Sequence, residues 1–382
     1  MLIKRRLSNL IQKRLNDPKA IILIGPRQAG KTTLLRQLTN ALKKPVLWWN
    51  GDEPDIRQIL SNITSTHLKN LIGKHTLLVI DEAPRIENIG MTIKLIVDNL
   101  PGVKVVATGS SAFELANRMN EPLTGRKWQY HLYPLSWEEM VNHHGLLEER
   151  RLLTHRLIYG YYPDIVGQAG DEPALLSQLA DSYLYKDILI LENIQKPERL
   201  ERLVQALAFQ IGNQVSYNEL GKITGLNNET VEKYISILEK AYVVFRLGAF
   251  SRNLRNELKK TRKIYFYDNG VRNAVIKHFN PVGLRDDIGA LWENFLVSER
   301  IKRMANRGLS VNCYFWRTAQ QQEIDYLEER DGKLLAWEFK WNASAKARFP
   351  KTFTRAYPHS ETKMITPDNM DGFLMDLGTL QK

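Results

Sequence analysis

The sequence predicts an α/β protein that begins with a parallel β-sheet, and three observations support this prediction. The apolar run at residues 20–24 lacks polar alternation, as expected for a strand that is buried on both faces of a parallel sheet. A glycine-containing loop and an amphipathic helix follow this run directly. Further apolar runs at residues 45–49, 77–80, 103–108 and 128–133 alternate with helical patterns. Strands and helices that alternate in this order favour a parallel sheet with right-handed crossovers.

The loop after the first strand has the spacing of a phosphate-binding loop. Residues 21–33 read IILIGPRQAGKTT, in which Gly25 and four further residues precede Gly30, Lys31 and Thr32. The glycines let backbone N–H groups point at phosphate oxygens, Lys31 supplies a positive charge for the β and γ phosphates, and the Thr32 hydroxyl suits the Mg²⁺ that bridges them. The helix that follows directs its positive dipole end at the phosphates. The sequence therefore predicts a nucleoside triphosphate site that includes Gly25, Gln28, Ala29, Gly30, Lys31, Thr32 and Thr33.

A pair of acidic residues predicts the metal-binding half of the same site. The apolar run at 77–80 ends in Asp81 and Glu82. A carboxylate at the tip of a buried strand can hold hydrated Mg²⁺, and the next carboxylate can polarise the attacking water. We therefore expect Asp81 to bind the metal and Glu82 to act as a catalytic residue on the water.

Two further polar positions are candidates for the site, one at the end of the fourth strand and one just before the fifth. Ser111 and Glu114 have the spacing of a capping box, which leaves Ser110, or less favourably Thr108, to sense the γ-phosphate. Arg126 stands just before the fifth strand. From its position alone, Arg126 is either a solvated surface charge or a functional residue.

Composition narrows the class of protein. The chain has 382 residues, a net charge of +12 and ordinary globular proportions of apolar and charged residues. The positive charge points to a polyanionic partner, either nucleic acid or an anionic membrane surface. Cys313 is the only cysteine, which excludes an internal disulfide and a cysteine-rich zinc site. No signal peptide or apolar stretch of membrane-spanning length stands out, so we expect a soluble, cytoplasmic protein without a membrane partner.

The motifs together resemble a known family. The stretches GPRQAGKTT, LLVIDEA, VVATGSS and LTGRKWQYHLYPLSWEE are similar to AAA-type P-loop ATPases that carry a C-terminal domain of unknown function. The resemblance covers nearly the whole chain. It implies ATP and Mg²⁺ as cofactors, a Mg²⁺-dependent ATPase activity, and a homo-oligomer, expected to be a ring. It also implies that Arg126 is a catalytic arginine finger in a neighbouring subunit, and that Pro163 of Gly160–Pro163 contacts the nucleotide base.

The middle of the chain predicts two helical units. Residues 136–200 read as helices and are expected to form a lid over the nucleotide. Residues 201–270 have winged helix-turn-helix spacing. The presumed recognition helix is acidic, so the wing is expected to contact the nucleic-acid backbone, although a winged helix used only for packing is the alternative. The wing at 245–263 has one acidic residue, Glu257, and seven basic ones: Arg246, Arg252, Arg255, Lys259, Lys260, Arg262 and Lys263.

The last part of the chain carries carboxylates in a suggestive order. A helix at 290–303 contains Glu293, a strand at 323–329 contains Asp325, and a strand at 334–341 contains Glu338 and Lys340. An Asp-Gly turn between the two strands favours a tight hairpin. This order resembles the PD-(D/E)xK nuclease-like superfamily. It predicts a divalent metal held by Glu293, Asp325 and Glu338, with Lys340 as a catalytic residue near the attacking water. A relic site that binds a ligand without cutting is the alternative.

These predictions divide the chain into four domains. They are a P-loop ATPase domain at 1–135, a helical lid at 136–200, a winged helix at 201–270 and a restriction-endonuclease-like α/β domain at 271–382. Two functions follow. In the first, ATP hydrolysis drives remodelling or processing of nucleic acid. In the second, the protein is an ATP-dependent oligomeric signalling switch whose C-terminal domain binds a protein partner without cleavage.

Overall fold

The computed structural model describes residues 2–42, 44–110, 122–181, 196–251, 261–346 and 348–376. The chain forms two compact units. The first unit comprises Met1–Leu135 with Lys240–Tyr242 and Ala305–Gly308, and the second comprises Ser136–Glu239, Val243–Met304 and Leu309–Lys382.

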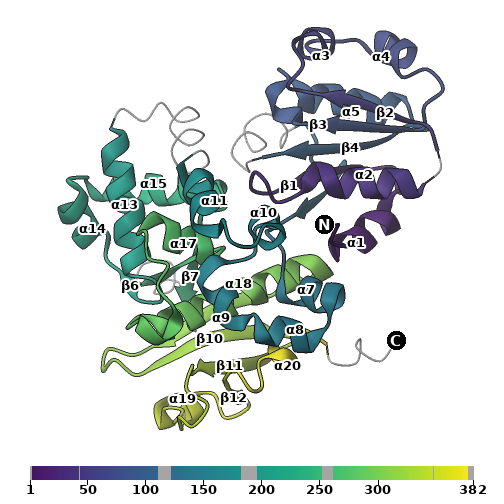
Figure 1. The fold of residues 1–382 in the computed structure, drawn as a ribbon. Helices are drawn as coiled ribbons and strands as arrows, with labels where there is room; N and C mark the ends of the chain where they lie inside the picture. Colours follow the sequence, from purple (N-terminus) through teal and green to yellow (C-terminus); the bar gives the residue numbers. More distant parts are fainter. Residues whose placement is uncertain are drawn as a thin grey trace. The chain divides into compact units, whose positions relative to one another are not determined.

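The first unit is built on a five-stranded sheet in which every strand pairs in parallel (Figure 1). Its strand order is β2-β3-β4-β1-β5, so the predicted parallel sheet is confirmed. The first strand is buried along its whole length, which explains its unbroken apolar run. The strands are β1 (Ala20–Ile24), β2 (Val46–Asn50), β3 (Leu77–Asp81), β4 (Lys104–Gly109) and β5 (Lys127–His131).

Helices complete the core of the first unit. Leu7 and Ile11 of the first helix join Leu34 and Leu38 of the second in one apolar cluster with the central strands. This packing explains the spacing of leucines after the phosphate loop. The described helical segments are α1 (Leu7–Arg14), α2 (Lys31–Ala41), α3 (Pro54–Leu60), α4 (Ser65–Ile72), η1 (Ala83–Arg85) and α5 (Ile89–Asn99).

The second unit is built on a seven-stranded mixed sheet of order β12-β11-β10-β9-β7-β8-β6. The two wing strands belong to this sheet, because β7 pairs in parallel with β9 through Gly248 and Tyr314. One continuous sheet therefore spans the predicted domain boundary at residue 270. The strands are β6 (Gln214–Val215), β7 (Val244–Ala249), β8 (Arg262–Phe266), β9 (Asn312–Arg317), β10 (Glu323–Arg330), β11 (Lys333–Phe339) and β12 (Glu361–Ile365).

The predicted hairpin between β10 and β11 is present, with Asp331 and Gly332 both at positive φ in the turn. The strand ends earlier than expected, at Phe339, so Lys340 lies just beyond it. Within the predicted helical segment at 136–200, one helix ends at Arg151 and the next begins at Leu153.

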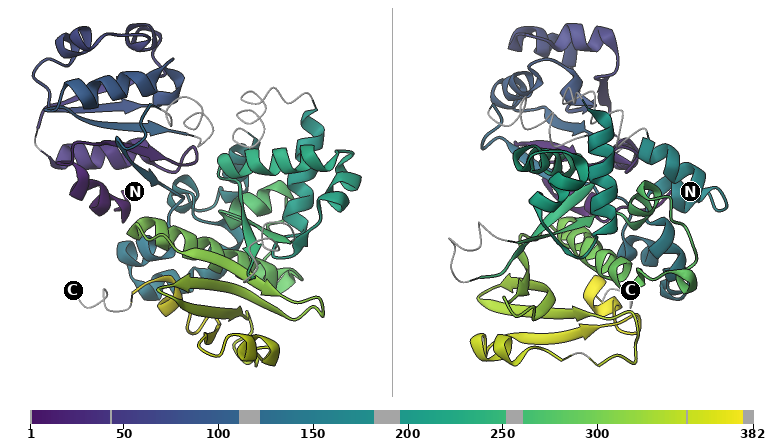
Figure 2. Two further views of the ribbon diagram at one scale, coloured as in Figure 1. Left: turned by 180° about the vertical axis from the view of Figure 1, so that it is seen from behind. Right: turned by 90° about the vertical axis from the view of Figure 1, so that its left-hand side faces the viewer.

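The long helix α18 (Ile288–Arg307) runs along the sheet of the second unit, as the left view of Figure 2 shows. Asn294 joins helix to strand, since its side chain accepts from the Phe266 N–H at 2.8 Å and donates to the Phe266 carbonyl at 3.0 Å. Buried Arg300 pairs with Glu328 of β10 at 2.6 Å. The other helical segments are α7 (Trp137–His144), α8 (Leu146–Arg151), α9 (Leu153–Tyr159), α10 (Pro163–Gly167), α11 (Glu172–Leu179), α13 (Pro197–Phe209), α14 (Tyr217–Thr224), α15 (Asn228–Lys240), α17 (Asn269–Val275), η3 (Val282–Leu284), α19 (Lys351–Ala356) and α20 (Asp371–Leu374).

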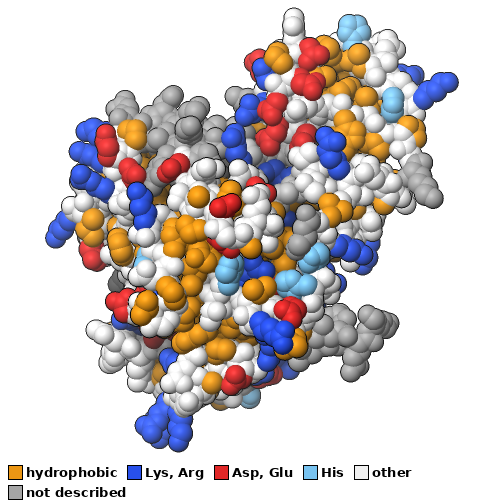
Figure 3. Space-filling view, viewed as in Figure 1, with side chains coloured by type: hydrophobic (Ala, Val, Ile, Leu, Met, Phe, Trp, Pro, Cys, Tyr) orange, Lys and Arg blue, Asp and Glu red, His pale blue; other side chains and the backbone are white. Residues whose placement is uncertain are grey.

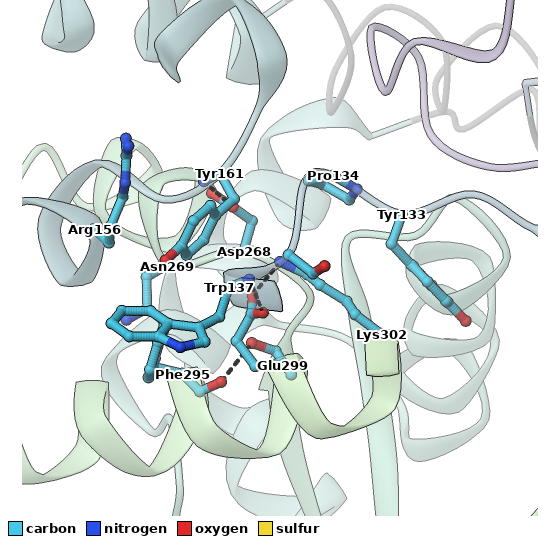
Figure 4. A network of polar contacts seen from close by, with 12 residues as sticks. Tyr133, Pro134, Trp137, Arg156, Tyr161, Asp268, Asn269, Phe295, Glu299 and Lys302 are labelled. Carbon is cyan, nitrogen blue, oxygen red and sulfur yellow. Dashed lines mark hydrogen bonds and ion pairs between the residues drawn. The ribbon is translucent and has the colours of Figure 1, made fainter. Parts of the chain in front are cut away.

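A buried polar network anchors the predicted lid to the second unit (Figure 4). The Trp137 N–H donates to Glu299 of α18 at 2.6 Å, and Lys302 of the same helix donates to the other oxygen of Glu299 at 2.7 Å. The Tyr161 N–H donates to Asp268 at 2.7 Å. The helices at the start of the predicted lid are thus held from within their own unit. Within the described ranges, no helix combines the length and the apolar character needed to cross a membrane.

Candidate functional site

The phosphate loop connects the buried strand β1 to the N-terminus of α2. Gly30 precedes the helix at φ 91°, a left-handed conformation that favours glycine. Gly25 is required for another reason, because a Cβ atom there would lie 2.0 Å from the Leu132 carbonyl oxygen. Of the other predicted loop residues, Gln28 has φ 58° and Ala29 is buried. Thr33 belongs to the first turn of α2.

Lys31 is buried within the loop. Its Nζ donates to the Gly25 carbonyl at 3.0 Å and to the Pro26 carbonyl at 2.9 Å. Burial lowers the pKa of Lys31, while the nearby Glu82 and Asp81 carboxylates act in the opposite direction. A desolvated ammonium whose hydrogen bonds go to neutral carbonyls gains electrostatic energy from an anion that reaches it.

The Asp81 carboxylate accepts hydrogen bonds from two hydroxyl groups. Thr32 donates to Asp81 Oδ2 at 2.7 Å, and Thr108 donates to Oδ1. Strand order explains the contact, because β4 lies between β1 and β3, so the carboxyl ends of all three strands meet at one edge of the sheet. The predicted metal-binding residues Thr32 and Asp81 are thus brought together.

Thr108 also fixes the position of Glu82, since its hydroxyl accepts the Glu82 N–H at 3.0 Å. Glu82 has φ 46°, which costs a residue with a side chain roughly 1–3 kcal/mol. The sequence favours Ser110 over Thr108 as the residue that senses the γ-phosphate. In the structure, Thr108 is the residue that contacts both Asp81 and Glu82. Ser110 lies just after β4 ends at Gly109.

Arg5 is a site residue that sequence reasoning missed. Its guanidinium donates to the Ala29 carbonyl of the phosphate loop at 2.6 Å and to the Tyr133 carbonyl at 2.6 Å. It therefore clamps the loop to the chain that follows β5. The N-terminal segment has several basic residues, and nothing in their pattern distinguishes Arg5 from its neighbours.

Two other predicted residues have defined surroundings. Arg126 is partly exposed, and its Nε lies 2.7 Å from Asp98 of α5 in the same unit. Pro163 begins α10 in the second unit. Just before it, Gly160 has φ 72°, and a Cβ atom there would lie 2.0 Å from Asp268. The Gly160–Pro163 stretch is thus fixed by contacts within the second unit, and its role at the nucleotide base stays a prediction.

The three carboxylates of the predicted C-terminal site, Glu293, Asp325 and Glu338, lie together with Glu323 in the structure, and these four are here called the carboxylate cluster. Glu338 lies 2.7 Å from Lys340, and Asp325 accepts the Phe339 N–H at 2.7 Å. Desolvation and then the charges of Glu293 and Glu338 raise the pKa of Asp325 well above its usual value, while Lys263 lowers it.

The structure brings the predicted Glu293, Asp325, Glu338 and Lys340 into one region. Among the residues that it describes, however, no three Asp, Glu, His or Cys side chains are arranged to hold a metal ion. Glu293 is instead bound by Lys263, at 2.9 Å, and by the Tyr265 hydroxyl, at 2.6 Å.

The predicted basic wing is partly neutralised. Arg246 binds Glu239 through its Nε at 2.7 Å, and Arg262 lies 3.6 Å from Glu232. Lys263 is buried and cannot touch a nucleic acid, which corrects its assignment to a contact surface. Basic and acidic side chains lie side by side over the helices around α13 in Figure 3. The wing residues Arg252, Arg255, Lys259 and Lys260, like Ser111 and Glu114 of the predicted cap, lie outside the described residues.

Comparison with protein families divides the chain in three. Residues 17–141 match the family described as AAA domain. Residues 150–282 and 288–373 match two domains of unknown function, DUF8612 and DUF4143.

Two proteins and one solved structure are similar to this chain over most of its length. An uncharacterized protein of Mycobacterium tuberculosis is 26% identical over 349 residues, 89% of this chain and 74% of that protein. An uncharacterized protein of Haemophilus influenzae is 24% identical over 341 residues, 82% of this chain and 80% of that protein. The solved Walker-type ATPase of Pyrococcus abyssi shares the fold, with a TM-score of 0.50 at 15% identity over 72% of this chain and 96% of that one. The chain therefore contains an AAA-type domain with a P-loop ATPase fold, as predicted.

Proposed function

We propose that the first unit binds ATP with Mg²⁺ and hydrolyses it. The observation that supports this best is the Asp81 carboxylate, which accepts the Thr32 and Thr108 hydroxyls beside the phosphate loop. The hydroxyl and carboxylate oxygens of Thr32 and Asp81 are hard ligands that fit Mg²⁺. Bound there, Mg²⁺ supplies charge neutralisation for the phosphates.

Lys31, the N-terminus of α2 and Arg5 each contribute to nucleotide binding in a different way. The buried Lys31 ammonium exchanges the Gly25 and Pro26 carbonyls for phosphate oxygens, which are stronger acceptors. The N-terminus of α2 adds its backbone N–H groups and its positive dipole end. Arg5 holds the Ala29 carbonyl and so keeps the loop in its curled conformation.

Glu82 is the proposed base that orients and polarises the attacking water. The Thr108 hydroxyl accepts its backbone N–H, and its φ of 46° departs from the extended backbone of β3. Arg126 is the proposed finger that acts on the nucleotide of a neighbouring copy. To do so, Arg126 must leave Asp98, and its partial exposure makes this exchange inexpensive.

Of the two uses of ATP, the contacts favour the oligomeric switch with a protein partner. The described wing cations are engaged by acidic neighbours, and the carboxylate cluster is neutralised by lysines and an arginine. Nucleic-acid processing is the second candidate. It is favoured by the net charge of +12 and by the four basic residues at 252–260.

The test of the proposed activity is Mg²⁺-dependent phosphate release from ATP by the full chain. Lys31→Ala should weaken nucleotide binding, whereas Glu82→Gln should keep binding and lose turnover. A wild-type protein that binds ATP but releases no phosphate at any protein concentration would contradict hydrolysis.

A further inference from the structure

Lys263 lies at a position where a charged residue is rare. Strand β8 lies between β7 and β6, and Lys263 pairs with Leu247 on one side and Gln214 on the other. Only 1% of its surface is exposed. A lysine in the interior of a sheet is stable only if acceptors surround its ammonium.

The ammonium of Lys263 finds these acceptors in the carboxylate cluster. Its Nζ lies 2.9 Å from Glu293 Oε1 and 2.5 Å from Glu323 Oε1. The Phe315 ring lies below it, with its centroid at 5.6 Å. The Tyr265 hydroxyl donates to the same Glu293 oxygen at 2.6 Å. One of the two oxygens of the Glu293 carboxylate is therefore already shared by two donors.

The remaining carboxylates are also satisfied. Arg317 lies 3.0 Å from the second oxygen of Glu323, and Lys340 lies 2.7 Å from Glu338. Asp325 accepts the Phe339 N–H. Four carboxylates thus face three cations, Lys263, Arg317 and Lys340. The region is close to neutral without any added ion.

We infer that Lys263 is the built-in counter-ion of the carboxylate cluster and that it excludes a divalent metal from it. The Mg²⁺ implied by the resemblance to nucleases does not fit these residues. A metal ion would have to displace an ammonium that is tethered to the sheet and buried. The displaced Lys263 would then remain as an unpaired charge in the protein interior, which is strongly unfavourable. The carboxylate cluster therefore keeps a nuclease-like arrangement from which Lys263 excludes the metal. This region does not cut nucleic acid.

The inference is tested by Mn²⁺ titration of the nucleotide-free full chain, with free Mn²⁺ counted by electron paramagnetic resonance. Wild type should show no binding that depends on Asp325, so Asp325→Asn should match wild type. Asp81→Asn accounts for ions at the phosphate loop. Lys263→Met keeps the apolar stem and removes the charge, and it should gain about one Mn²⁺ per chain, the number that the freed carboxylates can coordinate. The gain should disappear in the double variant Lys263→Met, Asp325→Asn.

Lys333→Met is the matched control, because Lys333 is an exposed lysine of the same sheet, and it should gain nothing. Thermal unfolding gives a second readout, since in the Asp81→Asn background Mn²⁺ should stabilise the protein that carries Lys263→Met and leave the protein with Lys263 unchanged. Wild-type Mn²⁺ binding that is lost in Asp325→Asn but kept in Asp81→Asn would overturn the inference, and this result does not require Lys263→Met to fold. A folded Lys263→Met protein without gained binding would overturn it as well.

Discussion

The Thr32 hydroxyl lies 2.7 Å from Asp81 Oδ2, although the two residues are 49 positions apart in the chain. The contact exists because the phosphate loop and the acidic pair follow strands that are separated only by β4. Thr108, near the end of that intervening strand, donates to the other Asp81 oxygen and accepts the Glu82 N–H. One hydroxyl therefore couples the residue proposed to bind the metal to the residue proposed to activate water.

Thr108→Val is expected to reduce turnover while leaving ATP binding nearly unchanged. The valine keeps the shape of threonine but leaves Asp81 and Glu82 without their shared partner, which should cost about tenfold in kcat. Thr39→Val is the matched control, because Thr39 is a buried threonine of α2 whose hydroxyl donates to the Arg36 carbonyl of the same helix. Steady-state kinetics measure kcat for Thr108→Val and Thr39→Val. Equal kcat values for the two variants would contradict the role of Thr108.

Arg5→Gln is expected to weaken ATP binding by about tenfold, or about 1.4 kcal/mol. The reason is that the phosphate loop loses its clamp to the chain after β5. The ATP affinity of Arg5→Lys should lie between those of wild type and Arg5→Gln, because an ammonium keeps the charge but lacks the planar fork that spans both carbonyls. Exposed Lys13 of α1 provides the control Lys13→Gln. Nucleotide titration of folded Arg5→Gln that gives the wild-type affinity would show that the clamp is only structural.

Arg126→Ala is expected to lose turnover and keep ATP binding, because the finger acts on the nucleotide of another copy. The specific activity of wild type should accordingly rise with protein concentration. Arg85→Ala is the control, since Arg85 is also an exposed arginine of the first unit, paired with Asp52 at 2.9 Å. A monomer whose specific activity does not depend on concentration would exclude the trans role.

Much of the first unit could be predicted from the sequence because its central strands, β1, β3 and β4, are almost entirely buried. The predicted bounds of the first strand agree with the observed ones, and those of the other strands agree within two residues. The phosphate loop and Asp81 could be assigned because local spacing determines their geometry. Thr108 was ranked second because the strand order, which places β4 between β1 and β3, is not encoded in local patterns.

The second unit was harder to predict because its decisive contacts are not local. The order Glu293, Asp325, Glu338 and Lys340 correctly indicated residues that come together, but it gave no sign of Lys263. That lysine was counted as part of a basic wing, since seven basic residues in a short segment indicate a solvated surface. Its side chain is buried in the unit and contacts Glu293 of α18, which lies 30 positions further along the chain.

Nucleic-acid binding, the second candidate, is tested by the double replacement of Lys259 and Lys260 by Gln. If this segment contacts phosphates, DNA affinity should fall for all sequences, and the salt dependence should flatten by about one unit per lost contact. The replacement of exposed Lys69 and Lys74 by Gln removes the same charge from the first unit and is the control. Equal affinities for the two double variants would remove the wing from any nucleic-acid contact.

The central claim is hydrolysis of ATP at the Thr32, Asp81 and Glu82 edge of the first sheet. Its most direct test is single-turnover and steady-state phosphate release, with Mg²⁺ and with EDTA, by wild type and Glu82→Gln at equal nucleotide occupancy. The account predicts that release requires Mg²⁺ and that Glu82→Gln binds ATP within about twofold of wild type but turns over at least about 100-fold more slowly. Wild-type turnover by Glu82→Gln would contradict the account.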